Sequence, residues 1–484
     1  MRRLLSLNMC LAALVATAAP AQAAVTLLAK GALTGTTDLS GLTGPLENGL
    51  AGNILGGLGS GLAYAGGNTF LALPDRGPNA TAYNAAVDDT TSYIGRFQTI
   101  TMALTQSAGG SALPFTLTPT LTATTLFSSA APLIYGSGAG LGNRIDGSPL
   151  GSGAPVQNTA STYYFTGRSD NYGAGGSGNP ADARLDPESI RVSNDGKSVF
   201  VSDEYGPYVR QFDRTTGQLI KTFTLPSNLD VANVSPNGAS EISGNTSGRT
   251  ANKGMEGLAI TPDGKTLVGI MQAALIQDAA ATPNLLRIVT IDIASGATRE
   301  YGYMLTTGSG VSEIVAINDH EFLVDERDGK GLGDGSSAKI KQIFKIDLVN
   351  AADITGLLGK AASDAAVKKG STPFLDLVTA LTASGLTKDQ IPAKIEGLAF
   401  GQDVMVNGVL THTLYVANDN DFVPGTAGAN QFFVFGFQDG DLPGFLPQQL
   451  TGAVPEPLTW VLLVTGFGLV GASLRRRRTT TVTA

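Results

Sequence analysis

The alternation of apolar and polar positions is clearest in residues 185–213, LDPESIRVSNDGKSVFVSDEYGPYVRQFD. The runs IRV and SVFVS are rich in β-branched residues, and Asn194-Asp195-Gly196 stands between them. Short runs of this kind around an Asp-Gly turn are typical of a β-hairpin. The stretch therefore predicts three strands joined by turns, with Glu188 before the first strand and Asp203-Glu204 after the second.

The same unit returns along the chain. Copies occupy residues 255–272 (MEGLAITPDGKTLVGIMQ), 313–328 (EIVAINDHEFLVDERD), 396–421 (EGLAFGQDVMVNGVLTHTLYVANDND) and, in degenerate form, 61–77 (GLAYAGGNTFLALPDRG). Successive lead glutamates, Glu188, Glu256, Glu313 and Glu396, are 68, 57 and 83 residues apart. Each interval accommodates four strands with their loops, which is the content of one propeller blade.

We therefore predict an all-β fold, a β-propeller of six or seven blades, over residues 25–450. A two-sheet sandwich explains the alternation equally well, but it does not explain why an acid recurs at the same place in each hairpin. Further strands are expected at 25–28, 93–128, 285–293 and 341–348, and a closing strand in NQFFVFGF (430–437).

Three segments depart from this pattern. Residues 135–182 are dominated by Gly, Ser, Asn and Asp, and we expect an insertion that reaches over one face of the fold. Residues 350–395 contain the convincing helical patterns and are expected to be a small helical insert. Residues 438–453 form a Pro/Gly/Gln-rich linker to the C-terminal tail.

Composition agrees with a β-rich protein, because 62 of the 484 residues are glycine and only 15% are charged. The formal net charge is −8, and removal of the two terminal segments would make the body more acidic, since they hold six arginines and one glutamate. Such a body does not suit nucleic acid or anionic membranes, whereas bound cations would suit it well.

The termini carry targeting patterns. Residues 1–24 combine Arg2-Arg3, an apolar core and the small-x-small site Ala21-Gln22-Ala23, which predicts a cleaved secretory signal peptide. The single cysteine, Cys10, lies within it, so the mature protein would contain no disulfide. At the other end, seventeen uncharged residues (458–474) are at the lower limit for a transmembrane helix, and Arg475–Arg478 follow them.

Residues 451–484 resemble the PEP-CTERM sorting signal of Gram-negative bacteria. The VPEP box at 454–457, the short transmembrane segment 458–474 and the basic end 475–478 carry this resemblance. It implies export through the inner membrane, a transient membrane anchor and processing by an exosortase. Release to the cell surface or the extracellular polysaccharide matrix would follow.

The repeated unit resembles the family described as "esterase-like activity of phytase". The segments that carry the resemblance are ALPDRGPN (72–79), DPESI (186–190), VSDEYGPYVRQFD (201–213), KGMEGLAITPDGKTL (253–267), EIVAINDHEFLVDERDG (313–329), KIEGLAF (394–400) and VANDNDF (416–422). The resemblance implies a secreted propeller, related in concept to calcium-dependent phytases, that hydrolyses phosphoric or carboxylic esters.

Acids that recur at one blade position would converge on the channel of a propeller. Carboxylates within a few ångströms raise one another's pKa unless a cation neutralises them, and Ca²⁺ accepts six to eight oxygen ligands. We therefore expect a Ca²⁺ site formed by Asp75, Glu188, Asp203, Glu256, Glu313, Glu396 and Asp419. The alternative is a structural salt-bridge network with Arg76, Arg191, Lys253, Arg327 and Lys394, which recur near the same acids.

A site that mixes cations and carboxylates has a chemical use. Arginine and Ca²⁺ would hold a phosphate and stabilise developing charge, while a carboxylate orients water. The candidate catalytic residues are Arg76, Glu188, Glu204, Glu256, Glu326 and Arg327. Each acidic cluster taken alone is also compatible with a solvated turn.

Other chemistries lack support. The sequence contains no Gly-x-Ser-x-Gly nucleophile elbow and no nucleotide-binding fingerprint, and its two histidines, His320 and His412, fall at turns or strand starts. The leading hypothesis is a secreted, surface-sorted phosphoester hydrolase. A non-catalytic, calcium-stabilised matrix or ligand-binding propeller is the alternative, and a lactonase-type propeller is the third; the natural substrate and the oligomeric state stay open.

Overall fold

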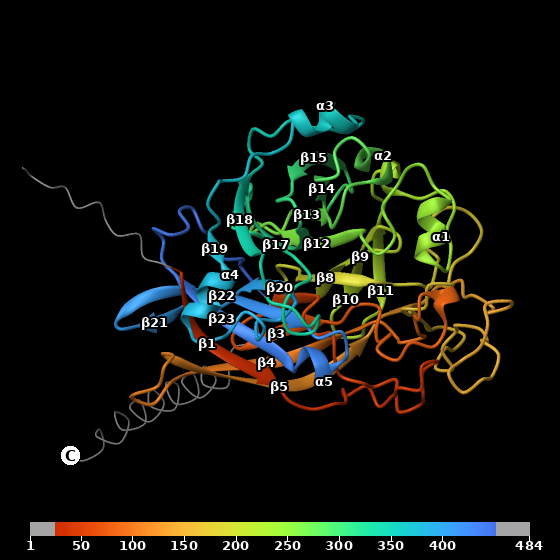
Figure 1. Ribbon diagram of the computed structural model, residues 1–484, viewed down its shortest axis with the longest axis horizontal. Coiled ribbons are helices and arrows are strands. Elements are labelled where there is room, and N and C mark those ends of the chain that lie inside the picture. The colour runs from red at the N-terminus through yellow and green to blue at the C-terminus, as the bar shows by residue number, and fades with distance from the viewer. Residues whose placement is uncertain (1–24, 452–484) are drawn as a thin grey trace, which may run out of the picture.

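The computed structural model describes residues 25–451, in which five β-sheets of four or five strands are arranged around a central axis (Figure 1). The all-β propeller prediction is confirmed, but the expected six or seven blades are wrong because the described residues form five. Each blade runs from an inner to an outer strand. The inner strands β2, β8, β12, β16 and β20 contact one another in a closed ring, with β20 beside β2.

The blades follow chain order. The first contains β2 (Gly61–Tyr64), β3 (Thr69–Leu73), β4 (Arg96–Gln106) and β5 (Phe115–Leu126), and the second β8 (Pro187–Val192), β9 (Ser198–Asp203), β10 (Tyr208–Asp213) and β11 (Leu219–Phe223). The third contains β12 (Met255–Ile260), β13 (Thr266–Met271), β14 (Leu285–Asp292) and β15 (Thr298–Met304). The fourth contains β16 (Gly310–Ala316), β17 (Glu321–Arg327), β18 (Lys341–Asp347) and β19 (Leu375–Asp376).

The two ends of the propeller domain meet in the fifth blade. Its strands are β20 (Lys394–Phe400), β22 (Val409–Asp419), β23 (Asn430–Phe437) and, on the outside, β1 (Thr26–Leu33), while β21 (Val404–Val406) pairs with β22 alone. The first strand of the domain therefore completes the last blade instead of beginning a blade of its own.

The two atypical segments decorate blades and add none. Within residues 135–182 lies β7 (Tyr163–Tyr164), paired with β6 (Ser128–Ser129), and the insertion packs at the side of the first two blades. The 350–395 segment contains α3 (Gly359–Asp364), α4 (Leu377–Ala383) and the outer strand β19, so it is partly helical as predicted. The remaining short helices are α1 (Gly238–Ser243), α2 (Ile276–Ala279), α5 (Pro424–Ala427), η1 (Ala85–Val87) and η2 (Ser227–Leu229).

Apolar residues on both faces of a strand explain why the blades pack against one another. In β9, Val199 and Val201 lie in a core with residues of the first blade, whereas Phe200 faces a core shared with the third blade. Side chains alternate between the two faces of a strand, so a continuous apolar run buries both faces. The SVFVS run therefore fits a strand between two neighbouring blades.

A buried ion pair crosses the axis. The Nη2 atom of Arg191 lies 2.8 Å from Oε2 of Glu313, and Nη1 of Arg191 donates to the carbonyl oxygen of Leu62 at 2.7 Å. Glu313 also accepts hydrogen bonds from the hydroxyl of Ser189 (2.9 Å) and the backbone amide of Leu258 (3.1 Å). These groups belong to β2, β8, β12 and β16, so one ion pair connects four of the five inner strands.

The terminal predictions fall outside the described residues. The signal peptide (1–24) and nearly all of the sorting segment (451–484) lie there. Among residues 25–451, none of the helices is long and apolar enough to cross a membrane.

The role of β1 in closing the ring can be tested with Leu28, which is 2% exposed and packs in a core with residues of β3 and β23. Leu28→Ala should lower the free energy of unfolding by about 2–5 kcal/mol, because it leaves a cavity at the closure. The matched control is Leu39→Ala, at a side chain that is 58% exposed, which should change stability by no more than about 0.5 kcal/mol. Equal effects in urea denaturation would contradict this account of the closure.

Candidate functional site

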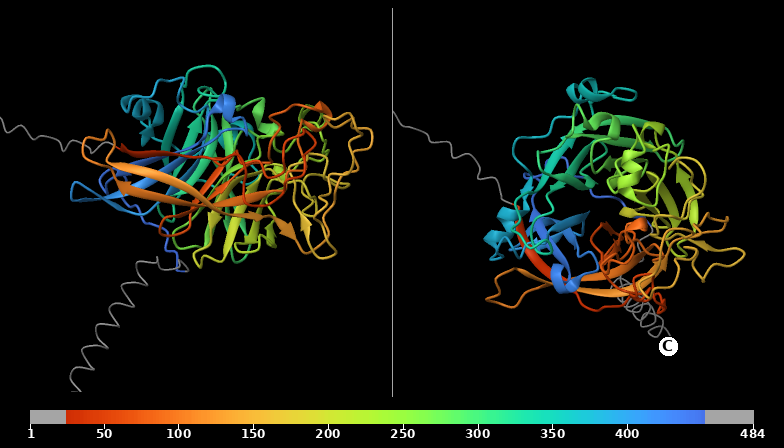
Figure 2. Two further views of the ribbon diagram at one scale, coloured as in Figure 1. Left: turned by 90° about the horizontal axis from the view of Figure 1, so that it is seen from below. Right: turned by 45° about the vertical axis from the view of Figure 1, so that its right-hand side comes forward.

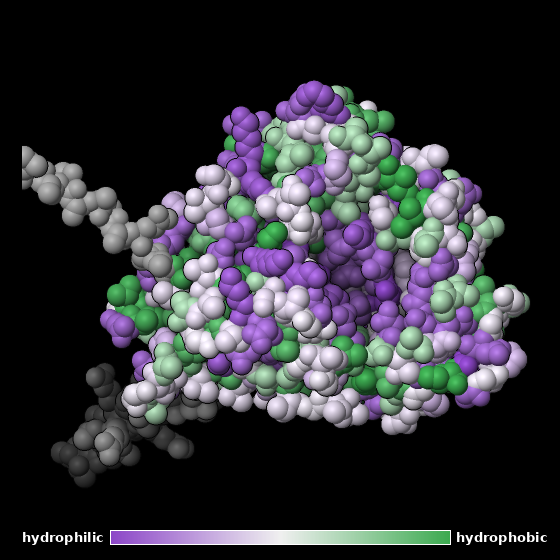
Figure 3. Space-filling view, viewed as in Figure 1, coloured by the Kyte–Doolittle hydropathy of each residue, from purple (hydrophilic) through white to green (hydrophobic). Residues whose placement is uncertain are grey.

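A polar cavity of about 520 Å³ opens at one end of the propeller axis, visible as a hollow surrounded by hydrophilic residues in Figure 3. Its charged lining is predominantly acidic. The seven acids are Asp75, Glu188, Glu204, Glu256, Asp328, Glu396 and Asp421, and the four bases are Arg76, Lys253, Arg327 and Lys394. We call this space the acid cavity. No residue of the 135–182 insertion lines it.

Three of the lead glutamates reach the acid cavity because the inner strands carry the same irregularity. The pairing of β8, β12 and β20 with their neighbours shifts at Glu188, Glu256 and Glu396 respectively. A β-bulge leaves one residue outside the ladder and re-aims its side chain. The bulges therefore bring these three carboxylates to the cavity.

Glu313 does not occupy the equivalent position. In β16 the pairing shifts between Val311 and Glu313, so Ser312 stands at the bulge and Glu313 lies one residue further along. Because a shift of one residue turns a side chain to the other face, Glu313 points into the axial ion pair with Arg191. The prediction that Glu313 joins the ring therefore fails, and its carboxylate is already occupied by protein donors.

The register of β9 separates the neighbouring acids Asp203 and Glu204. Asp203 is buried at the end of the strand, where Oδ1 accepts the amide of Asp186 (3.1 Å) and Oδ2 lies 3.6 Å from Nε of Arg210. Glu204, the next residue, turns to the acid cavity and accepts the amide of Gly254 at 3.0 Å. Of the two predicted residues, only Glu204 lines the cavity.

The same alternation separates Glu326 from Arg327. Glu326 is buried away from the cavity and accepts hydrogen bonds from the hydroxyl of Tyr303 (2.6 Å) and the amide of Thr306 (3.1 Å), and it pairs with Lys369. Arg327 lines the cavity and forms an ion pair with Glu396. Glu326 therefore supports the cavity rim and does not reach the place where the prediction put a catalytic group.

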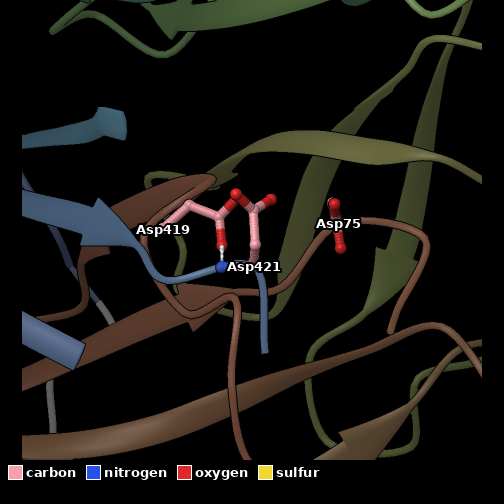
Figure 4. Close-up of side chains that lie close together, drawn as sticks. All are labelled: Asp75, Asp419 and Asp421. Atoms are coloured by element: carbon pink, nitrogen blue, oxygen red, sulfur yellow. Dashed lines mark hydrogen bonds between the residues drawn. The ribbon is translucent and has the colours of Figure 1, made fainter. Parts of the chain in front are cut away.

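Asp75, Asp419 and Asp421 form one carboxylate cluster, with oxygen atoms within 4.8 Å of one another (Figure 4). Lys394 forms ion pairs with Asp419 and, at 2.8 Å, with Asp421. Burial would raise the pKa of Asp419, but Lys394 outweighs it and lowers that pKa. A lysine ammonium thus already neutralises much of this cluster.

Asp186, Glu188 and Glu204 form a second cluster, also with oxygen atoms within 4.8 Å of one another. Arg76 pairs with Asp186, with Nη1 2.9 Å from Oδ2. Within residues 25–451, neither oxygen of Glu188 has a hydrogen-bond partner or a cationic partner within salt-bridge distance. Oε2 of the adjacent, buried Glu256 accepts no hydrogen bond when both carboxyls are ionised, and the carboxyls of Glu204 and Glu256 share a hydrogen bond when one of them is protonated. The second cluster is therefore the less neutralised of the two.

Burial and mutual repulsion make these carboxyls reluctant to ionise. Burial, followed by the charge of Glu256, raises the pKa of Glu188 well above its usual value, and burial, followed by Glu204, does the same for Glu256. The pKa of Glu204 rises to about 7, through burial and the charge of Asp186. At neutral pH the cluster therefore holds a proton or attracts a cation.

The donor set fits a hard divalent cation. Such ions prefer carboxylate oxygens, and the second cluster offers three carboxylates with the orphaned oxygen of Glu256 beside them. Asp186 was absent from the predicted ligands, although it stands two residues before Glu188. Predicting it requires knowing which loop residues fold back towards the axis.

The chain belongs to the phytase-like family, whose description is "esterase-like activity of phytase", since the family model matches residues 53–422. The match includes all five inner strands and the residues of both carboxylate clusters.

Similarity to individual proteins is more distant. An uncharacterized secreted protein of Arthroderma benhamiae is 31% identical over 193 residues, which cover 33% of this chain and 37% of that relative. The hydrazine synthase of Kuenenia stuttgartiensis aligns with a TM-score of 0.30 and 13% identity, over 81% of each chain. The β-propeller domain of Myceliophteria thermophila Cps50 (Swd1) aligns with a TM-score of 0.20 and 11% identity, over 47% of this chain and 51% of that one.

The raised pKa of Glu204 predicts how stability depends on pH in metal-free protein. The folded chain keeps a proton up to about pH 7, whereas the unfolded chain releases it near the ordinary value of 4.5. Stability contributed by this proton is complete below pH 4.5 and is lost as the pH rises through 7. The Tm of protein dialysed free of metal should therefore be higher at pH 5 than at pH 8. Glu204→Gln should reduce this difference. A Tm that rises between pH 5 and pH 8 would contradict the prediction.

Glu256 provides a test of cation binding. At pH 8, Glu256→Gln should raise the Tm of metal-free protein, because it removes a buried carboxyl whose ionisation the fold opposes, and should weaken Ca²⁺ binding about tenfold or more. Calorimetric titration and the Ca²⁺-induced rise in Tm measure both effects. Asp439→Asn, at a side chain that is 94% exposed, is the matched control and should change neither. An unchanged Ca²⁺ response in Glu256→Gln would exclude Glu256 from the cation site.

Proposed function

We propose that this protein is a secreted hydrolase that cleaves phosphoesters in the acid cavity with the help of a divalent cation, Ca²⁺ in the first instance. The observation that carries the proposal is the second carboxylate cluster, where Glu188 is unpaired and Oε2 of Glu256 is orphaned although it is buried. Family membership supports ester hydrolysis as the reaction class. The cavity volume of about 520 Å³ falls within the range typical of small-molecule sites.

Asp186, Glu188 and Glu204 would hold the cation, with Glu256 beside them. When bound, the cation would supply Lewis-acid polarisation of a phosphoryl oxygen. In metal-free protein the pKa of Glu204 is raised to about 7, and a bound cation would lower it, so Glu204 would be an ionised ligand at neutral pH. Gly254 orients Glu204 through its backbone amide.

Two further bases complete the recognition of an anionic substrate. Arg327 is held at the cavity by Glu396, so its guanidinium adds positive charge at a fixed place. Lys253 lines the cavity, and no carboxylate among the described residues lies within salt-bridge distance of its ammonium. Lys253 is therefore available to bind a phosphate, whereas Arg76, Arg327 and Lys394 each pair with a carboxylate.

Secretion is part of the proposal. The relative from Arthroderma benhamiae is described as secreted, and residues 1–24 have the pattern of a signal peptide. We extend this to the tail, where the VPEP box, the apolar run and the arginines would direct exosortase processing and release into the cell-surface or polysaccharide matrix.

The principal alternative is a non-catalytic propeller in which these charges stabilise the fold. The ion pairs of Arg76 with Asp186, Arg327 with Glu396 and Lys394 with Asp419 favour it, because they neutralise several carboxylates without a ligand. A lactonase-type reaction at the same cavity is the third candidate. Substrate tests separate the three.

Full-length protein should release phosphate from a phosphomonoester such as p-nitrophenyl phosphate when Ca²⁺ is present and not after chelation. Glu204→Gln should lower activity at least about 10- to 100-fold, because it removes a carboxylate that would hold the cation. Asp203→Asn is the matched control, since Asp203 is the adjacent acid that faces away from the cavity, and it should retain activity if its Tm shows that it folds.

Turnover of only a short acyl ester or a lactone would show that the protein is a hydrolase, but one whose substrates are not phosphoesters. Absence of turnover on all three substrates, with Ca²⁺ still raising the Tm, would favour the non-catalytic alternative.

A further inference from the structure

The segment after the last strand crosses the end of the propeller opposite the acid cavity. We call residues 438–451 the strap. The amide of Leu446 donates to the carbonyl oxygen of Ile317 at 2.8 Å, Nε2 of Gln448 donates to that of Val192 at 2.8 Å, and the amide of Thr451 donates to that of Asn194 at 2.8 Å. These partners lie in or beside the β16–β17 and β8–β9 turns. We call the end of the propeller that holds these turns the turn face. The described part of the chain therefore ends on the turn face, opposite the acid cavity (Figure 2, left).

An apolar hairpin projects from the same end of the fifth blade. Strand β21 pairs only with the first residues of β22, beyond the point where β20 ends its own pairing at Phe400. Its large side chains are exposed to solvent: Met405 by 53%, Val409 by 54% and Leu410 by 56%. Leu446 of the strap is likewise 53% exposed. The turn end of the molecule therefore presents large apolar side chains that the described residues do not cover.

The short segment between Thr451 and the uncharged run 458–474 limits how far the turn face can lie from a membrane into which that run inserts. Seven peptide steps lead from Thr451 to Leu458, the first residue of the uncharged run 458–474, and Arg475–Arg478 follow that run. Seven extended residues span at most about 25 Å. A run of this length and composition is sufficient to insert into a bilayer. Insertion would therefore hold the turn face close to the lipid surface.

We propose that, before the tail is processed, the turn face docks on the bilayer that takes up residues 458–474, with the β21–β22 hairpin in contact with lipid. Partly buried apolar side chains add interfacial affinity to such an anchor. Asp403 and Asp439 flank the hairpin and pair with His412, and the net charge of the chain, −8, favours zwitterionic over anionic lipid. The acid cavity then opens away from the membrane.

Tryptophan probes test this arrangement in the full chain, because Trp460 is its single tryptophan and Trp460→Phe removes the background. Met405→Trp reports on the hairpin. Leu358→Trp is the matched control, since Leu358 is similarly exposed (52%) but lies on the cavity side of the molecule. Its position there follows from the next residue, Gly359, whose amide donates a hydrogen bond to Asp278 of α2. Both variants would be reconstituted into phosphatidylcholine vesicles with or without brominated acyl chains.

Brominated chains should quench Met405→Trp emission about twofold or more and leave Leu358→Trp unchanged, because only the hairpin enters the interface. Equal quenching of both probes, or none at Met405, would overturn the proposal, as would failure of the chain to float with the vesicles. Burial of the Met405 probe that depends on protein concentration and not on lipid would assign the hairpin to a second copy of the chain instead. Tighter binding to anionic vesicles would overturn the choice of lipid.

Discussion

The arrangement of the molecule depends on one buried ion pair at the axis, between Arg191 and Glu313. A buried pair repays its desolvation only when its remaining hydrogen-bonding groups are satisfied, and backbone groups of Leu62 and Leu258 serve that purpose here. The pair connects four inner strands and lies between the acid cavity and a second cavity of about 70 Å³ that Arg191 lines on the strap side.

Around the acid cavity the fold holds carboxylates closer together than they would stay in solution. Burial and mutual repulsion raise the pKa values of Glu188 and Glu256. The packing of the surrounding blades offsets the free energy that is needed to hold these carboxyls together. The two clusters differ in how their charge is balanced, because Lys394 serves the Asp75 cluster while Glu188 in the other cluster has no such partner among the described residues. This asymmetry favours the cluster of Asp186, Glu188 and Glu204 as the cation site.

The repeated hairpins were sufficient to predict the propeller and to direct attention to Glu188, Glu256 and Glu396. They did not reveal the register, because a bulge displaces one residue and the motif around Glu313 carries its acid one position later. For the same reason, the sequence could not tell Glu204 from Asp203 or Arg327 from Glu326, since strand alternation decides which neighbour faces the cavity. The number of blades also depended on tertiary contacts, because β1 completes a blade that begins more than 360 residues later in the chain.

The most direct test of the account is a crystal structure of the full chain grown with Ca²⁺, with the ion located by anomalous scattering. The account predicts one ion bound by carboxylate oxygens of Asp186, Glu188 and Glu204, with the side chain of Glu256 beside it. An acid cavity without an ion at saturating Ca²⁺, or an ion bound only by Asp75, Asp419 and Asp421 in place of Lys394, would contradict it.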